Sequence, residues 1–399
     1  MPWQGSRQQA AGGSVSAGRG RGSRWVLSVG GLVAVVVALG ACSGGGEPTQ
    51  VQNCTTNPSL PQCQHDTTPQ TPTTLKGLAA PRGLSIGAAL DANFTVTNSA
   101  RYDSLVAAEF NEVTPGNFMK WEPLNRVDRY SYRWAWPDSL VSFAASHGMK
   151  VRGHTLVWHN QLPNWLANPG TAWTAATLWP VLKEHIDSVV GHYKGKLYAW
   201  DVVNEALNDG NGTMRSAIWL NTLGPTYVDT AFAEARKVDP NVLLFYNDYN
   251  IETAGPKQDS AYALVQRLKA KNLIDGIGFQ AHFLVNNDLS GAPTRQQMID
   301  TFNRFAALGV KIHLTELDVR VPNGAAQNVL DRQASLYSDV VAACRVVSAC
   351  EMIVVWGVFD GESWIPGTFP GWGQALLWSG DLNGWSKKAT YNAVTTALQ

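Results

Sequence analysis

The chain has 399 residues, of which 45% are hydrophobic, and its 31 lysines and arginines balance its 31 aspartates and glutamates. This length suits one large domain or two modest ones, and the apolar fraction is enough for a substantial core. A formal net charge of zero, without any run of basic residues, argues against nucleic-acid binding. The 16 tryptophans can fill a core, but a surplus of this kind often lines a groove for a flat, weakly charged molecule.

The first forty residues have the features of an export signal. Three arginines precede an apolar run at 25–39, whose 15 residues are fewer than the ~20 that cross a bilayer. The run leads into Leu39-Gly-Ala-Cys42, which resembles a bacterial lipobox, whose cysteine becomes lipidated and forms the new N-terminus. We therefore predict a lipoprotein signal peptide over 1–41 and lipidation of Cys42, with an ordinary signal peptide or a membrane anchor as the alternatives.

This interpretation places the protein at the cell surface or in the periplasm of a bacterium, or secreted, with a lipid anchor as its only membrane contact. Residues 42–75 consist mainly of Gly, Thr, Pro, Gln and Ser, which predicts a flexible tether. In an oxidising compartment the other cysteines form two short-range candidate disulfides, Cys54 with Cys63 and Cys344 with Cys350. Neither CxxC nor HExxH occurs, so we expect no metal site and no cofactor.

From residue 76 to 399 short apolar segments alternate with longer amphipathic ones. The predicted strands are 84–90, 111–115, 150–156, 198–205, 242–248, 274–282, 311–318 and 353–360. The predicted helices include 178–192, 227–237, 259–271, 294–308 and 328–344. This order predicts an α/β fold, a (β/α)8 TIM barrel forming a single catalytic domain over 76–399. A doubly wound open sheet is the alternative, but no GxGxxG follows the first strand.

A barrel of this kind carries its functional residues at the C-terminal ends of its strands. Polar and aromatic side chains do follow one predicted strand after another. They are Asn117 and Lys120, His154, Trp158 and His159, Asn204 and Glu205, Asn247, Asp248 and Tyr249, Gln280 and His282, Glu316 and Asp318, and Trp356 and Asp360. Because buried polar groups are costly, such convergence indicates a functional site.

Two glutamates at these strand ends suggest glycosidic-bond hydrolysis. Glu205 ends the fourth predicted strand and Glu316 lies on the seventh, so the two can face each other across the barrel mouth. Hydrolysis of a glycosidic bond needs one carboxyl group as an acid and a second as a nucleophile or base. Asn204 offers an amide to a sugar hydroxyl, and His282 could orient Glu316 while Asp318 holds the histidine. Taken singly, each glutamate could merely form an ion pair at the rim.

Seven segments carry a family resemblance. They are NFMKW at 117–121, VRGHTLVWHNQLPNW at 151–165, WDVVNEAL at 200–207, YNDYNIE at 246–252, FQAHF at 279–283, LTELDV at 314–319 and VVWGVFDGESW at 354–364. In this order and spacing, residues 79–399 resemble glycoside hydrolase family 10, the endo-β-1,4-xylanases, a retaining family with a (β/α)8 fold. Any one segment alone would be a weak signal that other barrel hydrolases share.

The resemblance implies that Glu205 is the acid/base and Glu316 the nucleophile. It implies that Asn204 binds the 2-hydroxyl of the sugar at the cleavage point, and that Gln280 and His282 flank the nucleophile. It also implies binding residues on the non-reducing side, an aromatic cage, leaving-group contacts and a family disulfide. The residues on the non-reducing side are Asn117, Lys120, His154 and Gln161, and the aromatic cage consists of Trp158, Trp356 and Trp364. Tyr249 and Asn250 make the leaving-group contacts, and Cys344 with Cys350 forms the family disulfide.

Some residues depart from the family pattern or have no expected role in the site. Gly116 stands where many members carry a glutamate, Ile365 where a basic residue is common, and Trp378 where phenylalanine is usual. Asp201 is expected to make backbone or loop hydrogen bonds beneath the site. Core or helix-packing positions are expected for Trp134, Trp136, Trp165, Trp173, Trp179 and Trp219. No motif supports a role in the site for His185, His192 and His313, which are expected to be structural.

The resemblance therefore implies a retaining endo-β-1,4-xylanase that acts by double displacement. Glu316 would attack the anomeric carbon while Glu205 protonates the leaving oxygen, and Glu205 would then deprotonate water. The expected partner is xylan or a xylo-oligosaccharide, and the expected oligomeric state is a monomer. Two alternatives are a related glycosidase acting on other β-1,4-glycans or short xylo-oligosaccharides, and a non-catalytic lipoprotein that binds polysaccharide.

Overall fold

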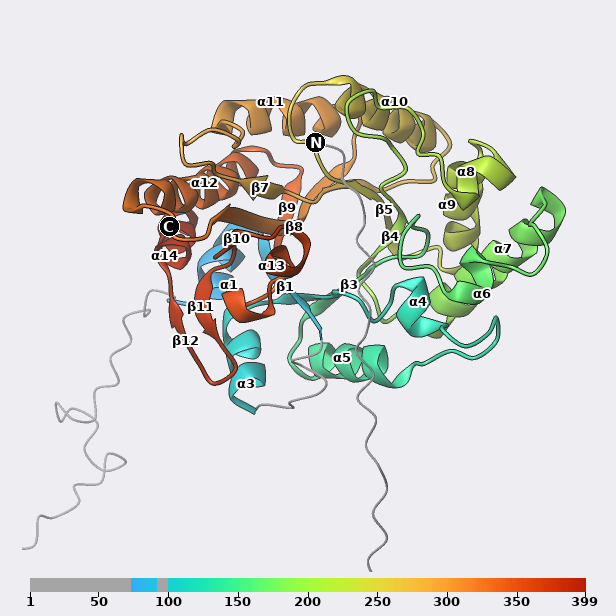
Figure 1. The fold of residues 1–399 in the computed structure, drawn as a ribbon, viewed down its shortest axis with the longest axis horizontal. Helices are drawn as coiled ribbons and strands as arrows, with labels where there is room; N and C mark the ends of the chain where they lie inside the picture. Colours follow the sequence, from blue (N-terminus) through green and yellow to red (C-terminus); the bar gives the residue numbers. More distant parts are fainter. Residues whose placement is uncertain (1–72, 92–99) are drawn as a thin grey trace, which may run out of the picture. The chain divides into compact units, whose positions relative to one another are not determined.

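The computed structural model describes residues 73–91 and 100–399, where eight parallel strands close into a barrel (Figure 1). In ring order the strands are β1 (Ser85–Leu90), β2 (Glu112–Pro115), β3 (Lys150–Gly153), β4 (Ala199–Asn204), β5 (Leu243–Asp248), β6 (Gly276–Phe279), β8 (Lys311–Pro322) and β9 (Cys350–Val355). Pairing of β9 with β1 closes the ring. The predicted (β/α)8 fold is confirmed.

The long helices form an outer layer around the strands (Figure 1), and shorter helices lie in the connections. They are α1 (Leu75–Ala79), η2 (Ala80–Arg82), α3 (Ala100–Glu109), α4 (Trp121–Leu124), α5 (Ala135–Ser146), α6 (Asn164–Ala167), α7 (Ala175–His192), α8 (Ile218–Leu223), α9 (Tyr227–Val238), α10 (Pro256–Ala270), α11 (Arg295–Ala306), α12 (Gln327–Val346), η3 (Asp360–Glu362), α13 (Ile365–Thr368) and α14 (Ala389–Leu398). Local chemistry sets several starts: Thr174 and Thr294 cap α7 and α11 through their hydroxyls, and Pro256 occupies the first turn of α10.

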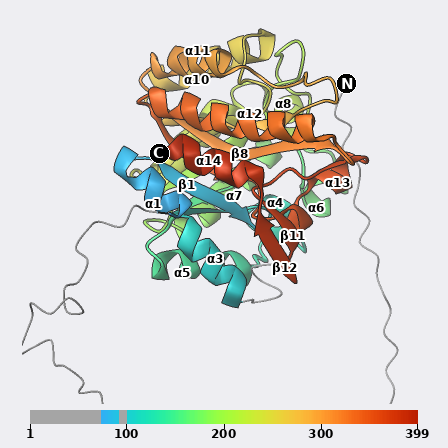
Figure 2. The ribbon, with the colours of Figure 1, turned by 90° about the vertical axis from the view of Figure 1, so that its left-hand side faces the viewer.

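Two smaller strands extend the barrel sheet, and two others form a sheet of their own. β7 (His282–Leu284) runs parallel to β8, and β10 (Trp372–Gly373) runs antiparallel to it. β11 (Trp378–Asp381) and β12 (Gly384–Lys387) form a separate hairpin. Figure 2 shows this hairpin with α4, α6 and α13 at the end toward which the arrow of β1 points. These segments therefore cover the C-terminal end of the barrel, where the sequence predicts the site.

The predicted helices agree with the structure to within one turn, whereas four predicted strands need correction. The segment 150–156 is a strand only as far as Gly153, and the segment 311–318 continues to Pro322. The segment 274–282 divides into β6 and β7, and Ala281 between them has a left-handed backbone (φ 59°). The last predicted strand exists, but its predicted bounds, 353–360, are wrong, because β9 starts earlier and ends at Val355. Val358 and Phe359 lie in a loop and are buried there, so their apolar side chains resemble a strand in the sequence. Asp360 belongs to η3 and pairs with Lys388 (2.9 Å) instead of ending a strand.

Charged side chains fill part of the barrel interior. Arg152 on β3 is fully buried and forms a two-point ion pair with Asp201 on β4, and its Nη1 lies 2.7 Å from His313 Nδ1. Burial favours the neutral form of Asp201, but the charges of Arg152 and His154 outweigh it and lower the pKa of this carboxyl. Asp201 thus pairs with two side chains, which corrects the expectation of backbone or loop hydrogen bonds.

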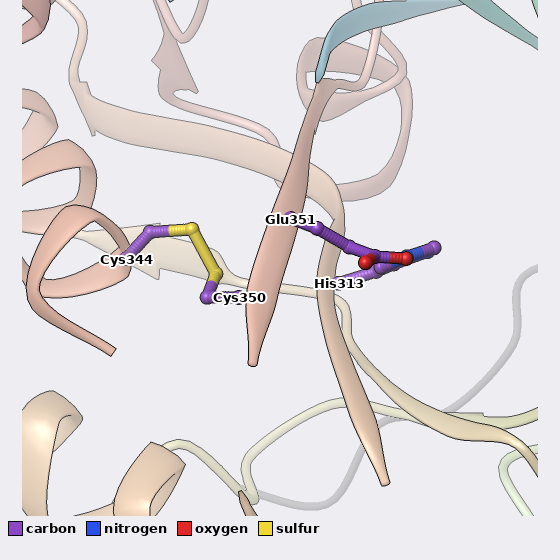
Figure 3. The surroundings of a disulfide bond; sticks show 4 residues. All are labelled: His313, Cys344, Cys350 and Glu351. Atoms are coloured by element: carbon purple, nitrogen blue, oxygen red, sulfur yellow. A yellow bond between two sulfur atoms is a disulfide. The ribbon is translucent and has the colours of Figure 1, made fainter. Parts of the chain in front are cut away.

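One disulfide joins the end of α12 to the start of β9, between Cys344 and Cys350. Figure 3 shows that the disulfide and the Glu351 side chain point to opposite sides of β9, as alternate residues of a strand do. Glu351 points inward, where its Oε1 lies 3.3 Å from His313 Nε2. The predicted Cys54–Cys63 pair and Cys42 lie outside the described residues. Among the described helices, none is both long enough and apolar enough to cross a membrane.

Candidate active site

Glu205 and Glu316 both lie at the C-terminal end of the barrel, separated around the ring by β5 and β6. Glu205 directly follows β4, and Glu316 lies within the long strand β8. Only 6% of Glu205 and 5% of Glu316 is exposed. Glu205 also has a left-handed backbone (φ 56°), which is uncommon for a residue other than glycine. Such backbone outliers cluster at functional sites.

Glu316 is held in its ionised form by its neighbours. Asn247 Nδ2 donates a 2.8 Å hydrogen bond to Oε1, and His282 Nε2 lies 3.2 Å from Oε2. Burial raises the pKa of Glu316, but the positive charges of His154, His282 and Lys120 and the hydrogen bond from His282 outweigh burial. The net effect lowers the pKa of Glu316 below its ordinary value, so the group is a carboxylate at neutral pH.

His282 lies between two carboxylates. Its Nε2 faces Glu316, and its Nδ1 lies 3.0 Å from Asp318 Oδ2 on the same strand as Glu316. Burial lowers the pKa of His282, but the two carboxylates outweigh this effect and raise the pKa to about 10. Asp318 is itself fixed, because Trp364 Nε1 donates a 2.8 Å hydrogen bond to its Oδ2. His282 is therefore a fixed cation beside Glu316.

The two oxygens of Glu205 have different surroundings. Oε1 accepts hydrogen bonds from Gln280 Nε2 (2.9 Å) and Asn204 Nδ2 (3.3 Å). Oε2 has no hydrogen-bond partner among the described residues, and His159 Nδ1 lies 3.8 Å from it. Burial and the charges of Arg215 and Lys257 lower the pKa of His159 to about 3, so this ring is neutral. Two amides thus hold one oxygen of Glu205, whereas the other oxygen is buried without a hydrogen-bond partner among the described residues.

Three amides connect the two glutamates. Asn247 Nδ2 donates to Asn204 Oδ1 (2.9 Å) as well as to Glu316, and Gln280 Nε2 donates to Asn204 Oδ1 (3.2 Å) as well as to Glu205. The sequence placed Asn247 at a strand end but gave it no role. Its position opposite Asn204 in the register of β4 and β5 is the signal that could have identified it. We call Asn204, Asn247 and Gln280 the amide bridge.

Asn117 and Lys120 occupy the loop after β2. Asn117 Oδ1 accepts hydrogen bonds from Lys120 Nζ and Gln161 Nε2, both at 3.1 Å. The main-chain and side-chain nitrogens of Asn117 donate to the carboxylate of Asp91, which directly follows β1. A Cβ at Gly116 would lie 2.8 Å from Asp91 Oδ2. The absence of a side chain at 116 therefore leaves room for a carboxylate that the sequence did not single out.

Lys120 brings a positive charge to the same region, and both Lys120 and His154 contact aromatic rings there. His154 is buried, and its Nδ1 lies 3.0 Å from Asp201 Oδ2. Lys120 Nζ lies 4.8 Å from the ring centroid of Trp158 and 5.7 Å from that of Trp356. Burial lowers the pKa of Lys120 against the opposing effect of nearby carboxylates. Trp158 and Trp356, two of the three predicted cage tryptophans, thus lie beside polar groups that can bind hydroxyls.

A pocket of about 280 Å³ opens beside these groups. Trp356 and Trp364 line it together with Asp91, Gly116 and Asn117. The ring centroid of Trp356 lies 5.3 Å from that of His154, and Trp364 packs against His282 at 4.9 Å. Ile365 is fully buried in a small apolar cluster and is not among the lining residues.

Tyr249 and Asn250 lie on the other side of Glu205. Tyr249 donates to Asp209 Oδ2 (2.9 Å) and accepts from Arg215 Nη2 (3.2 Å), while Asn250 is exposed and has φ 54°. Beneath them, burial raises the pKa of Asp248 to about 6 despite its ion pair with Lys257 at 2.8 Å. Among the described residues, no group of His, Cys, Asp and Glu side chains is arranged to hold a metal ion.

The geometry agrees with comparisons to known proteins. The model for glycosyl hydrolase family 10 matches residues 74–397. The chain belongs to this family. It is therefore a glycoside hydrolase, which confirms the predicted enzyme class and the predicted family.

Relatives and solved structures in family 10 span most of the chain. Endo-1,4-beta-xylanase 1 of Gibberella zeae is 40% identical over 76% of this chain and 86% of its own length. Endo-1,4-beta-xylanase B of Thermotoga neapolitana is 39% identical over 82% and 91%, respectively. The crystal structure of xylanase 10B from Thermotoga petrophila with xylobiose has a TM-score of 0.76 and 38% identity, and covers 82% of this chain and 97% of that one.

Proposed function

We propose that the protein is a retaining endo-1,4-β-xylanase that hydrolyses internal bonds of xylan by double displacement. The observation that carries this proposal is the different chemical surroundings of the two glutamates. Glu316 has neighbours that keep it ionised, whereas Glu205 keeps one oxygen without a hydrogen-bond partner among the described residues. The names of the relatives, which are endo-1,4-beta-xylanases, support the choice of substrate.

In the first step a carboxylate oxygen of Glu316 attacks the anomeric carbon, and the bond to the leaving oxygen breaks. Glu205 donates its proton to that oxygen through the oxygen that lacks a partner. In the second step Glu205 removes a proton from water, the water oxygen bonds to the anomeric carbon, and Glu316 is released. His282 stays charged throughout and stabilises the Glu316 carboxylate as it forms again.

Sugar binding follows from the surrounding polar and aromatic groups. On the non-reducing side we assign Asn117, Lys120, His154 and Gln161, and around the sugar at the bond cut we assign Trp158, Trp356 and Trp364. Flat pyranose faces pack against indole rings, and hydroxyls pair with amides and imidazoles. We assign Tyr249 and Asn250 to the leaving-group side.

The experiment assays the chain on xylan, carboxymethylcellulose and aryl xylosides, beside Glu316→Ala. We expect reducing sugar from xylan with the wild type, and essentially none with the variant. Proton NMR of the earliest product should show the β-anomer. No release of reducing sugar from xylan, full activity of Glu316→Ala, or an initial α-anomer would each contradict the proposal.

We also propose export through residues 1–41, a tether over 42–75, a monomeric catalytic domain over 76–399 and a lipid on Cys42. The support is the lipobox-like sequence that ends in this cysteine. The test compares wild type and Cys42→Ala in a bacterial host that lipidates exported proteins. Mass spectrometry of the N-terminus should find acyl chains on the wild type alone, and an unmodified wild-type cysteine would exclude the anchor.

A further inference from the structure

An exposed aromatic segment follows β2, outside the residues assigned so far. Among the described residues the exposed large apolar side chains are Val127 (72%), Tyr130 (73%), Trp136 (44%), Leu289 (41%) and Val346 (66%). Three of these five fall within 127–136, the connection from β2 into the first turn of α5. The sequence predicted a core or helix-packing position for Trp136, and this exposure corrects that prediction.

The segment is anchored, so its side chains are held in place. Arg133 N donates to Leu124 O (2.8 Å), and Asp128 Oδ1 accepts from the amides of Tyr130 and Ser131 at 2.7 and 2.8 Å. The Trp136 ring lies against Phe118 with centroids 4.8 Å apart. A platform that is already ordered loses little conformational entropy when a ligand binds.

The segment also carries an arginine without a carboxylate partner. Arg126 pairs with Glu122, and Arg129 pairs with Glu184. Arg133 is exposed and forms no ion pair or side-chain hydrogen bond with any described residue, although its guanidinium lies 5.4 Å from the ring centroid of Trp136. The guanidinium lies over the indole ring, so a carboxylate-binding group and an aromatic ring that can stack on a sugar stand next to each other.

The platform continues directly from the non-reducing side of the site. Phe118, which contacts Trp136, directly follows Asn117 and precedes Lys120 in the loop after β2. Segments that connect strands to the following helices lie at the C-terminal end of a barrel, the same end as Glu205 and Glu316. A polysaccharide leaving the cleft at its non-reducing end therefore meets a flat aromatic ring and a free cation.

We propose that Trp136 and Arg133 form a distal binding platform for the non-reducing side of an acidic xylan, with a xylose ring on Trp136 and a uronate side group on Arg133. This inference rests on the proposed xylanase function, because the occupant is the chain that extends out of the cleft. Charge complementarity selects the uronate, since the two acidic residues nearest to Arg133 in sequence are already occupied. Asp128 accepts from the turn that it caps, and Asp138 pairs with His192 and Tyr193.

The test measures kcat/KM of the full chain on xylotriose, long linear xylo-oligosaccharides, arabinoxylan and glucuronoxylan. Trp136→Ala should lower kcat/KM about 3- to 10-fold on the three long substrates and less than about 2-fold on xylotriose. Trp136→Phe, which keeps a smaller ring, should recover part of the loss. Val346→Ala removes an exposed apolar side chain at the end of α12 and is the matched control without effect.

Substitution of Arg133 should affect only the substrate that carries uronate groups. Arg133→Gln should lower kcat/KM about 3-fold or more on glucuronoxylan alone, and the wild-type preference for glucuronoxylan should weaken as salt is added. Arg133→Lys should retain most of that preference. Electrophoresis of the Glu316→Ala chain, with and without Trp136→Ala, through gels containing glucuronoxylan measures binding without catalysis. The Trp136→Ala change should reduce the retardation of the chain.

Several outcomes would overturn the platform. Unchanged kcat/KM on long substrates would exclude it, and so would an equal loss on xylotriose, which would indicate a defect at the cleavage point or in the fold. A loss of self-association on Trp136→Ala, seen by sedimentation, would instead make the patch a contact between copies of the chain. Failure of the wild type on every xylan would refute the proposed function, whereas wild-type hydrolysis without any effect of these variants would refute only the platform.

Discussion

Glu112, the first residue of β2, is a buried acid whose protonation should make the stability of the barrel depend on pH. Its side chain is fully buried; Thr114 donates to Oε1 (2.8 Å), and Oε2 has no hydrogen-bond partner among the described residues. Burial raises the pKa of Glu112 from 4.5 to about 8. Gly87 lies opposite Glu112 in the register with β1, and any Cβ there would overlap this carboxyl group.

The sign of the change of stability with pH depends on whether the folded or the unfolded chain holds the proton of Glu112. Below about pH 4.5 both states are protonated, so this group contributes no pH dependence. Between about pH 4.5 and 8 the folded chain keeps a proton that the unfolded chain has released, so stability falls by about 1.4 kcal/mol per pH unit. Between about pH 5.5 and 7.5 the loss is on the order of 3 kcal/mol. Above about pH 8 both states are ionised and the loss is complete.

Glu112→Gln should remove this dependence, because a neutral amide has nearly the shape of the protonated acid. The assay measures the free energy of unfolding in urea at several pH values, followed by tryptophan fluorescence. The difference between variant and wild type should grow in favour of the variant by about 1.4 kcal/mol per pH unit across the window. Glu122→Gln, at a surface glutamate paired with Arg126, is the matched control. A difference that stays constant from about pH 5 to 8 would mean that folded Glu112 is already ionised, refuting the reasoning.

Three further predictions concern the site and the disulfide. Asp318→Asn should lower the pKa of His282, and the loss of this neighbouring cation should raise the pKa of Glu316. The acidic limb of the pH profile of kcat/KM should therefore move to higher pH by about 1 to 2 units. An unmoved limb would show that His282 does not lower the pKa of Glu316. Gly116→Ala should displace Asp91 and raise KM about 3-fold with little change in kcat, and steady-state kinetics on xylo-oligosaccharides would contradict this if KM were unchanged. Replacing both cysteines of the disulfide between α12 and β9 by alanine should lower the free energy of unfolding by about 2 kcal/mol, as measured in urea; an unchanged value would show that closing this short loop contributes nothing.

Periodicity predicted most elements because barrel strands are buried on both faces and read as short apolar runs. The same signal failed after Val355, since the apolar residues Val358 and Phe359 are buried by loop packing without any strand pairing. It also missed the extension of β8 to Pro322, which pairs with β7 and β10. Such pairings depend on segments far apart in the sequence, which a local pattern cannot register.

The strand-end residues of the site were visible in the sequence, whereas the groups that connect them were less so. Asn247 was recognised only as a polar strand end, because nothing local distinguishes an asparagine that joins two carboxylates from one that caps a turn. Asp91 was not singled out, since its carboxylate matters through Gly116, a residue that contributes no side chain. Asp201 was expected to make backbone or loop hydrogen bonds, because nothing in the sequence marks its partner Arg152, on the neighbouring strand, as buried.

Closure of the ring has a consequence for how activity returns after denaturation. Asp91 follows β1 and Trp356 follows β9, and these strands pair in register at Ile86 and Ile353, near opposite ends of the folded sequence. Contacts between such distant residues form slowly, because a long loop must close first. Helical circular dichroism should therefore recover before xylan hydrolysis in a refolding sample. The rate at which hydrolysis recovers would therefore measure the rate at which β9 pairs with β1.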